Sequence, residues 1–453
     1  MGGKMRPTLQ RRQLKPNANR MNQPAAVEIW GGVECTCRRV GEAYSDQLVR
    51  NGHRDRLDDL DRFAALGLCT LRYPVLWETV APESLDRPDW QWPDERLARL
   101  QALGIAPIVG LVHHGSGPRY TALDQPTFAP GLARYARMVA ERYPWVQYYT
   151  PVNEPLTTAR FSGLYGLWFP HGRSDAAFVR ILINELQATR LAMLAIREVN
   201  PRAQLVQTED LGQAHGTPAL AAQVEFENHR RWLTFDVLAG ALTPAHPLWD
   251  YLRGHGIAAA ELQEFIDHPL PPDVLGLNHY VTSERYLDER LDLYPGQPAI
   301  RGLHHPAYVD LQALRVAGVA TAGPEALLRT AWERYGRPLA ITEAHLGCTR
   351  EEQLRWLYQL WEVAGRLRAH GVDLRALTVW SLLGAFDWDN LLTQDGASYE
   401  PGVFDVRGGQ PRPTALYPLV HSLIRRGDYA HPVLDGPGWW ERNIRFDWPV
   451  QAA

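Results

Sequence analysis

The sequence predicts an α/β protein built as one (β/α)8 barrel, a TIM barrel, with extended loops after its strands. Short apolar runs recur along the chain, and each is followed by a longer stretch with helical periodicity. Several of these runs are apolar at almost every position, which is typical of parallel strands covered on both faces. The length of 453 residues also fits, since such barrels extend from about 200 to more than 400 residues.

Eight candidate strands follow one another with no linker between them. They are Val27–Val33, Thr70–Val75, Pro107–Val112, Val146–Val152, Gln204–Thr208, Val274–Asn278, Leu339–Thr342 and Ala376–Trp380. Eight such repeats favour a closed barrel over an open doubly wound sheet. No G-x-G-x-x-G turn follows the first strand, so the main signature of a dinucleotide-binding fold is missing from the sequence.

Helical stretches separate the candidate strands, and a further segment flanks the barrel at each end. The predicted helices are Arg54–Leu66, Pro130–Tyr143, Asp175–Val199, Glu351–His370 and Pro413–Arg426. We expect the barrel to span residues 27–426. Residues 1–26 carry six basic and no acidic residues and are expected to form a disordered tail, within which Met21 is an alternative start. Residues 427–453 are expected to pack across the outer surface of the barrel through Trp439, Trp440 and Trp448.

The composition indicates a globular protein whose partner is a small neutral molecule. Hydrophobic residues make up 45% of the chain and charged residues 22%, close to the averages for globular domains. The net charge is −4 and the main body has no basic block, so binding to nucleic acid or to an anionic membrane is not expected. The sequence contains no apolar run of about 18 residues and no apolar secretory core near its start, which predicts a cytoplasmic location.

The four cysteines, Cys35, Cys37, Cys69 and Cys348, do not have the spacing of a metal site. Cys35 and Cys37 would point to opposite faces of a strand, which argues against a disulfide between them. We therefore expect free thiols in a reducing compartment, and neither a metal nor a cofactor.

Two carboxylates stand where candidate strands end. The fourth strand leads into Asn153-Glu154-Pro155, and the seventh leads into Thr342-Glu343. Because the reacting groups of a (β/α)8 barrel lie at the C-terminal ends of its strands, we expect Glu154 and Glu343 to converge at the barrel mouth. Two converging carboxylates with room for a sugar between them are what glycoside hydrolysis requires.

From about Glu28 to Arg426 the chain resembles glycoside hydrolase family 1, the retaining β-glycosidases. The resemblance rests on Thr150-Pro151-Val152-Asn153-Glu154-Pro155, similar to the family's T-x-N-E-P acid/base motif, on Ile341-Thr342-Glu343, similar to its I-T-E-N-G nucleophile motif, and on Trp380-Ser381-Leu382-Leu383, similar to its W-S-L-L sequence. It implies a double-displacement mechanism with Glu154 as acid/base and Glu343 as nucleophile.

The same resemblance implies supporting roles for further residues. Arg72 is similar to an arginine that pairs with the nucleophile, and Tyr280 to a tyrosine whose hydroxyl donates to it. The residues that the family pattern places against the sugar are Asn153, His113, Asn278, Trp380, Asp387 and Trp388. Among them, Asn153 would bind the 2-hydroxyl, and Trp380 would lie under the apolar face of the sugar.

The sequence departs from the family pattern around the sugar. His114 replaces a Trp, Asp387 replaces a longer Glu, and Ala344-His345 replaces the Asn-Gly after the nucleophile. The family's sugar-binding Gln on strand one has no clear counterpart, and either Glu34 or Arg38 takes its place. We therefore expect an intact reacting centre within a rebuilt shell of hydroxyl-binding residues.

Together these features predict a retaining exo-β-glycosidase that hydrolyses a small β-glycoside. A transglycosidase would use the same covalent intermediate and deliver the sugar to an acceptor other than water. A non-catalytic sugar-binding barrel is a further alternative, disfavoured because keeping two buried like charges is costly. A phospho-sugar glycosidase is also less favoured, since Asp389-Asn390-Leu391-Leu392 offers no lysine for a phosphate. The sequence does not indicate the oligomeric state.

Overall fold

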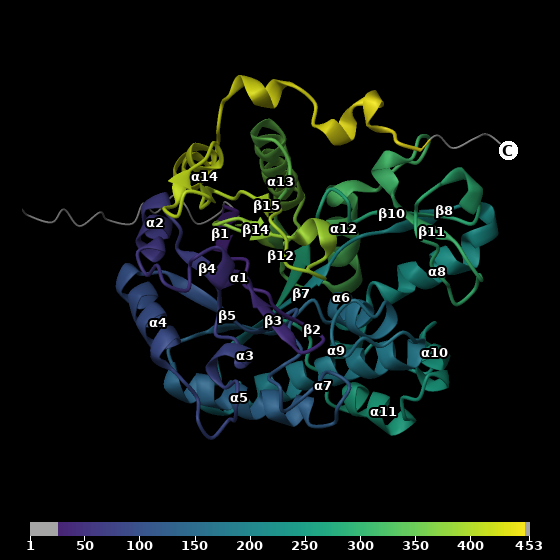
Figure 1. Ribbon diagram of the computed structural model, residues 1–453, viewed down its shortest axis with the longest axis horizontal. Helices are drawn as coiled ribbons and strands as arrows, with labels where there is room; N and C mark the ends of the chain where they lie inside the picture. Colours follow the sequence, from purple (N-terminus) through teal and green to yellow (C-terminus); the bar gives the residue numbers. More distant parts are fainter. Residues whose placement is uncertain (1–25, 449–453) are drawn as a thin grey trace, which may run out of the picture.

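A closed barrel of eight parallel strands forms the centre of the computed structural model, which describes residues 26–448 (Figure 1). The barrel strands are β1 (Glu28–Gly32), β4 (Thr70–Pro74), β5 (Ala106–His113), β6 (Tyr148–Asn153), β7 (Gln204–Asp210), β9 (Val274–Asn278), β12 (Leu339–Ala344) and β13 (Leu374–Val379). Their order around the ring is β1-β13-β12-β9-β7-β6-β5-β4, and β1 closes the ring by pairing with both β13 and β4. The predicted barrel is confirmed. The predicted tail of residues 1–26 lies, except for Ala26, outside the described residues.

All eight predicted strands are present, and they differ from the prediction mainly at their C-terminal ends. β7 continues two residues further, to Asp210, and β12 continues to Ala344. In contrast, β13 ends at Val379, so Trp380 follows the strand instead of belonging to it. These ends matter because they form the mouth of the barrel.

Helices surround the barrel. The longer ones are α2 (Asp59–Leu66), α4 (Gln91–Leu103), α5 (Phe128–Arg142), α7 (Asp175–Val199), α8 (Ala221–Arg230), α11 (Ala259–Asp267), α12 (Gly323–Tyr335), α13 (Arg350–Ala369) and α14 (Leu416–Arg426). The shorter ones are α1 (Gln47–Arg50), α3 (Trp77–Val80), α6 (Pro155–Ala159), α9 (Leu233–Leu238) and α10 (Trp249–Gly254).

Two predicted helix starts were wrong. The helix expected from Arg54 begins at Asp59, because the Arg54 amide donates to the Leu48 carbonyl at 3.0 Å within a series of turns. The helix expected from Pro413 begins at Leu416, because Pro413 instead belongs to a short β-ladder.

Small sheets extend the loops at the mouth. A hairpin of β2 (Cys37–Val40) and β3 (Ala43–Asp46) follows β1. The loops after β7 and β9 contribute β8 (Ala214–Gly216), β10 (Arg285–Asp288) and β11 (Val309–Gln312) to a three-stranded sheet, which lies beside α8 in Figure 1. The loop after β13 holds the pairs β14 (Ala385–Phe386) with β15 (Tyr399–Glu400) and β16 (Phe404–Asp405) with β17 (Arg412–Pro413).

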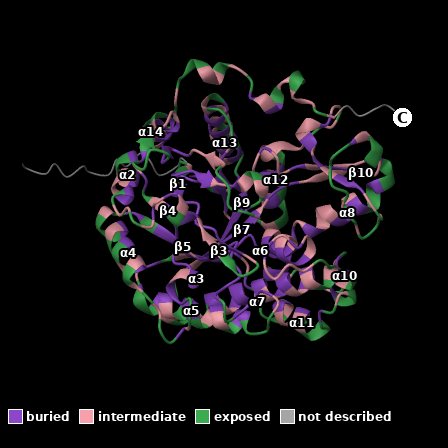
Figure 2. Cartoon of the chain, viewed as in Figure 1, coloured by how far each residue is buried: buried purple, intermediate pink, exposed green. Residues whose placement is uncertain are grey.

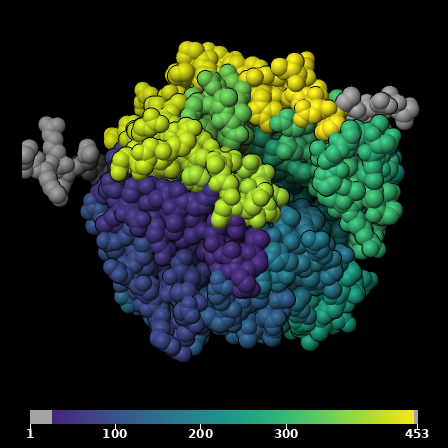
Figure 3. Space-filling view, in the orientation of Figure 1, coloured from purple at the N-terminus to yellow at the C-terminus, as the bar shows by residue number. Residues whose placement is uncertain are grey.

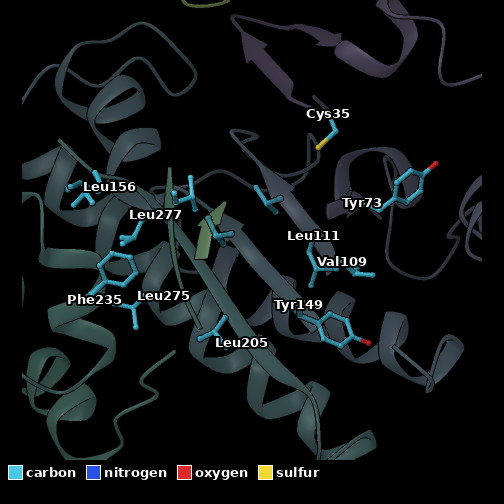
Figure 4. Close-up of a cluster of buried hydrophobic side chains, with 14 of the residues drawn as sticks. Cys35, Tyr73, Val109, Leu111, Tyr149, Leu156, Leu205, Phe235, Leu275 and Leu277 are labelled. Carbon is cyan, nitrogen blue, oxygen red and sulfur yellow. The ribbon is translucent and has the colours of Figure 1, made fainter. Parts of the chain in front are cut away.

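The core has two parts. Inside the barrel, one layer is filled from six strands by Trp30, Ile108, Val206, Val274, Ala340 and Ala376. Between the barrel and the helices, Leu205, Leu275 and Phe235 belong to a larger cluster of buried side chains (Figure 4). Buried residues accordingly follow the strands and the inner helix faces, while exposed residues lie on the outer helix faces (Figure 2). Burial of each such side chain contributes about 1.5–3 kcal/mol, which holds the mouth loops on a rigid base.

The segment after α14 runs across α13 and reaches the sheet of β10 and β11, as the yellow trace in Figure 1 shows. The Trp440 ring lies 5.3 Å from that of Trp356 on α13, and its indole donates to Gln359 at 2.8 Å. Trp448 packs against Tyr294 with 5.4 Å between ring centroids.

Among residues 26–448, no helix combines the length and the apolar character needed to cross a bilayer. All four cysteines are free thiols, two of them buried (Cys35 and Cys37) and two exposed (Cys69 and Cys348).

Candidate active site

Glu154 and Glu343 lie at the same mouth of the barrel. Glu154 directly follows β6, and Glu343 is the penultimate residue of β12. Both are buried, with exposed fractions of 5% and 3%. Two residues link them. Arg72 donates hydrogen bonds to Glu343 and to Asn153, which precedes Glu154. Asn278 donates to Glu154 and accepts from Thr342, which precedes Glu343. The structure therefore brings the two predicted carboxylates together.

The backbone is strained at several strand ends around this mouth. Glu154 has a φ of 45°, in the left-handed region that residues other than glycine rarely adopt. His114, Ser381 and Asp387 also have positive φ values, of 51°, 56° and 57°. Such conformations cost about 1–3 kcal/mol each and cluster at functional sites. The strain thus marks the mouth as the functional end of the barrel.

A cation and a hydroxyl bind the carboxylate of Glu343. Nη1 of Arg72 donates to Oε1 at 2.9 Å, and the Tyr280 hydroxyl donates to Oε2 at 2.5 Å. Burial raises the pKa of Glu343, whereas the charge of Arg72 and the hydrogen bond from Tyr280 act against that rise. Both contacts stabilise the ionised carboxylate, which is the form that can act as a nucleophile.

Glu154 contacts an amide and a neutral imidazole. Nδ2 of Asn278 donates to Oε1 at 2.6 Å, and Nε2 of His114 lies 3.6 Å from Oε2. Burial raises the pKa of Glu154 well above its ordinary value, and the negative charges of Glu343 and Glu209 raise it further. Burial lowers the pKa of His114 to about 3, so this imidazole carries no charge at neutral pH. The surroundings favour protonated Glu154, the form that a general acid needs.

Asn153, on β6 just before Glu154, has a fixed orientation. Its Oδ1 accepts hydrogen bonds from Arg72 at 2.7 Å and from the Thr208 hydroxyl at 2.8 Å. Its Nδ2 therefore faces Nε2 of His113 and of His114, at 3.5 and 3.3 Å. Asn153 thus presents its amide N–H groups on the side of the two histidines, and an amide N–H is a group that can donate to a sugar hydroxyl.

An aromatic wall lies beside the nucleophile. The rings of Trp380 and His113 stack with 5.3 Å between centroids, and the Arg72 guanidinium lies 4.5 Å from the Trp380 centroid. The indole N–H groups of Trp380 and Trp388 both donate to Oε2 of Glu34, at 3.3 and 3.2 Å. An indole face with polar groups at its edge suits a sugar ring, which has apolar C–H faces and a polar rim.

The structure distinguishes the two candidates for the missing strand-one glutamine. Glu34 lies at the aromatic wall, and its other oxygen accepts a hydrogen bond from the Thr36 amide at 2.9 Å. Arg38 lies on the β2 hairpin and pairs with Asp395 at 2.9 Å. Glu34 is therefore the residue that faces the predicted sugar position.

Asp387 differs from the sequence expectation. The sequence places it against the far hydroxyls of a sugar, but its carboxylate is 1% exposed and ion-paired with Arg50. The backbone amides of Gly396 and Ser398 also donate to it, at 2.6 and 3.1 Å. Both oxygens are occupied by the chain's own donors, so in this structure the side chain orders the loop at the mouth.

Glu209, near the end of β7, is a third carboxylate that the sequence analysis missed. It is fully buried and accepts hydrogen bonds from the Leu156 amide at 2.9 Å and from the Thr234 hydroxyl at 2.7 Å. Burial raises its pKa to about 7. The strand was predicted to end at Thr208, so Glu209 is the residue that follows the predicted strand. Glu154 was chosen because it follows a predicted strand, and the same criterion would have found Glu209.

The chemistry of the site depends on carboxylates and their hydrogen-bond donors. Within the described part of the chain, no three His, Cys, Asp or Glu side chains are arranged to hold a metal ion. The arrangement combines Glu343, whose ionised form Arg72 and Tyr280 stabilise, with Glu154, whose protonated form burial and neighbouring charges favour. This is the pattern of a nucleophile and an acid acting together.

Comparisons with known proteins found a matching family model, related sequences and similar structures. Residues 36–395 match the model of glycosyl hydrolase family 1. A bifunctional β-D-glucosidase/β-D-fucosidase from Bifidobacterium breve is 28% identical over an alignment of length 375, which covers 73% of this chain and 78% of that protein. A phospho-cellobiase from Klebsiella oxytoca is 23% identical over an alignment of length 312, which covers 64% of each protein. The solved structure of a β-glucosidase from Thermotoga maritima in complex with cyclophellitol superposes on this chain with a TM-score of 0.71 and 18% sequence identity. The superposition covers 90% of this chain and 99% of the β-glucosidase, which shows a shared fold.

Proposed function

The chain belongs to glycosyl hydrolase family 1, and from this premise we propose that it is a retaining exo-β-glycosidase acting on a small β-glycoside. The observation that carries the proposal is the contrast between two buried carboxylates at one mouth. Glu343 is bound by Arg72 and Tyr280, whereas Glu154 has a strongly raised pKa because of burial and neighbouring negative charges.

In the first step Glu343 acts as the nucleophile. One of its oxygens forms a bond to the anomeric carbon while the bond from that carbon to the leaving-group oxygen breaks. The leaving-group oxygen takes the proton of Glu154, so the leaving group departs as a neutral alcohol or phenol. Arg72 and Tyr280 keep Glu343 ionised and oriented until the attack.

In the second step Glu154 changes its role from acid to base. Once Glu343 is esterified by the sugar its negative charge is gone, and one cause of the raised pKa of Glu154 is removed. Glu154 then takes a proton from a water molecule as the water oxygen attacks the anomeric carbon and Glu343 is released. Two inversions at the anomeric carbon give net retention of its configuration.

The sugar is proposed to bind against the aromatic wall. Trp380 would lie under the ring, while Asn153, His113 and Asn278 supply hydrogen-bonding groups near the nucleophile. Glu34 and Trp388 would bind the hydroxyls at the far end. For Asp387 we propose an indirect role through the loop, because Arg50 and two backbone amides occupy its carboxylate.

The exo mode of action is supported by contacts between loops at the far end of this site. Arg38 pairs with Asp395, Ser45 donates to the same carboxylate at 2.7 Å, and Arg50 donates to the Gly396 carbonyl at 2.8 Å. These contacts hold the loop after β13 against the β2 hairpin. We propose that the loop held in this way blocks the site beyond one sugar, so that the site accepts the end of a chain and not its interior.

We also propose a cytoplasmic site of action. Cys69 and Cys348 are exposed free thiols, and such thiols persist most readily in a reducing compartment.

The test is a panel of aryl β-glycosides of gluco, galacto, fuco, manno and xylo configuration, with NMR of the first product. We expect at least one sugar to be hydrolysed with retention at the anomeric carbon. Inversion would overturn the double-displacement proposal, and absence of turnover on every sugar would overturn the hydrolase proposal. Adding acceptor sugars separates hydrolysis from transglycosylation, since a transglycosidase would release the aryl group faster and yield a new glycoside.

A further inference from the structure

A cavity of about 60 Å³ is lined in part by Asp210, whose charge acts on the proposed acid/base residue Glu154. Its wall includes Leu156 and Thr157, the second and third residues after Glu154, together with residues from the end of β7, from α8 and from the sheet of β8, β10 and β11. In Figure 1 these elements lie together on one side of the barrel. In Figure 3 the surface next to them is hollowed between the yellow-green and green parts of the chain.

This cavity lies across the barrel from the proposed sugar position. In the ring, β6 is opposite β13 and β7 is opposite β1. Trp380 follows β13 and Glu34 follows β1, whereas the cavity is at the ends of β6 and β7. A sugar bound against Trp380 therefore directs its leaving group past Glu154 and toward the cavity.

Arginines and carboxylates line the cavity, and most of them neutralise one another. Arg230 is paired with Glu227, and Nε of Arg285 donates to Asp310 at 2.8 Å. The carboxylate of Asp210 accepts a hydrogen bond from the Ser283 hydroxyl at 2.7 Å.

Two guanidinium groups that line the cavity, those of Arg160 and Arg231, form no ion pair with a carboxylate among the described residues. Arg160 donates only to the Tyr165 hydroxyl, at 3.2 and 3.3 Å, and Arg231 donates to the Gly212 carbonyl. The two differ in how far their charge is compensated. Burial acts against the charge of Arg160, but Tyr165, Glu227 and Asp310 raise its pKa overall. The buried Nε of Arg231, in contrast, has no hydrogen-bond partner among the described residues. Burial also lowers the pKa of Arg231 to about 10, which reflects how poorly its charge is compensated.

An arginine side chain stays protonated in a protein. Partial burial of a guanidinium that is not paired with an anion is therefore energetically costly, and binding of an anion would offset that cost. With all groups ionised, four arginines face three carboxylates in this cavity, which leaves one net positive charge. Guanidinium groups bind carboxylate and phosphate through paired, charge-assisted hydrogen bonds.

We propose that this cavity is a binding site for an anionic leaving group, in which Arg160 and Arg231 bind a carboxylate or phosphate carried by the aglycone. The proposal rests on the proposed glycosidase function and names its substrate class as β-glycosides of acidic alcohols or phenols. It differs from the expectation of a neutral partner, which was based on the overall charge of −4 and not on this local surface.

The test compares matched leaving groups on the sugar that the aryl-glycoside panel identifies. The substrates are the 3-carboxyphenyl, 3-phosphonophenyl and 3-carbamoylphenyl β-glycosides, and the readout is the ratio of kcat/KM for each anion to that for the neutral amide. In the wild type we expect a ratio of about ten or more, in line with charged hydrogen bonds, which declines as salt is added. The larger of the two ratios identifies carboxylate or phosphate as the preferred group.

Variants test whether Arg160 and Arg231 cause the preference for an anionic leaving group. Arg231→Met and Arg160→Met should each reduce the ratio severalfold while leaving the neutral substrate nearly unaffected, and Arg231→Lys should retain part of it. Asp210→Asn should increase the ratio, because it removes a negative charge from the cavity wall. Its influence on Glu154 affects all three substrates and cancels in the ratio.

Failure of this proposal can be distinguished from failure of the proposed function. If the neutral glycoside is hydrolysed and the wild-type ratio is near one, the glycosidase function stands and the anionic site is wrong. If no glycoside is hydrolysed, calorimetric binding of 3-hydroxybenzoate and 3-hydroxybenzamide decides the question, and equal binding of the two overturns the site. A ratio that Arg160→Met and Arg231→Met both leave unchanged also overturns it.

Discussion

The guanidinium of Arg72 donates a hydrogen bond of 2.9 Å to the carboxylate of Glu343. The same group donates to Oδ1 of Asn153 at 2.7 Å, so one side chain fixes the nucleophile relative to the residue that precedes the acid/base. Arg72 is 5% exposed, and its interaction with Glu343 is therefore weakly screened by solvent. Arg72 therefore both positions Glu343 and stabilises its ionised form, which is the form that can act as a nucleophile.

The Tyr280 hydroxyl is the second group that stabilises ionised Glu343, and Tyr280→Phe should shift the pH profile of the enzyme. Loss of this donor raises the pKa of Glu343, and activity is lost on the acid side as the nucleophile is protonated. The acid limb of kcat/KM against pH should therefore move to higher pH by about one unit, as expected for a charged hydrogen bond. An unchanged limb, or one at lower pH, would contradict this role. Tyr417→Phe on α14 is the control.

Replacement of the nucleophile should abolish turnover. Glu343→Ala removes the group that forms the covalent intermediate, and we expect kcat on the best aryl glycoside to fall by at least about 10³. The exposed Glu333 on α12 provides a control, since Glu333→Ala should retain wild-type activity. Near wild-type turnover in Glu343→Ala would remove Glu343 from the mechanism.

Replacement of the acid/base should have an effect that depends on the leaving group. A phenol of low pKa departs without protonation, whereas a poor leaving group needs the proton of Glu154. Glu154→Ala should therefore reduce the first step far less for a dinitrophenyl glycoside than for a phenyl glycoside of the same sugar. Pre-steady-state release of the phenol measures this step. Equal losses on both substrates would exclude Glu154 as the acid.

Much of the fold follows from local sequence patterns. Strands buried on both faces give continuous apolar runs, so all eight barrel strands could be located. For β9 the first and the last residue were both predicted correctly. Helices were harder to predict where they are short or weakly amphipathic. Helix α4 (Gln91–Leu103) was not predicted, because charged side chains interrupt its apolar face and buried Arg96 lies on that face.

The site could be predicted only where a residue's role depends on its place at a strand end. Glu154 and Glu343 have such places, but the side chain of Asp387 is directed by Arg50, which lies 337 residues away in the sequence. The choice between Glu34 and Arg38 depends on how the chain turns after β1, where the alternating strand pattern has ended. Likewise, the arginine cavity draws its wall from loops after three different strands. These long-range contacts have no local signature.

Glu78, on α3, is a buried carboxylate outside the proposed mechanism, and it should make the stability of the protein depend on pH. Its Oε1 accepts a hydrogen bond from the Gly117 amide at 2.9 Å, while its buried Oε2 has no partner among the described residues. Burial raises the pKa of Glu78 to about 7. The folded state therefore holds this proton more tightly than the unfolded state does, and the stabilisation is lost as the pH rises from about 4.5 through about 7.

Glu78→Gln cannot ionise, so its free energy of unfolding relative to the wild type should increase with pH. The difference between the two proteins should change by up to roughly 3 kcal/mol between pH 5 and pH 8, at about 1.4 kcal/mol for each unit of pKa difference. Urea unfolding at both pH values measures it, and the other titrating groups cancel in the comparison. Glu83→Gln, at an exposed position in the same region, should show no such dependence. If the difference between wild type and Glu78→Gln is the same at both pH values, Glu78 is not the buried titrating group that its surroundings imply.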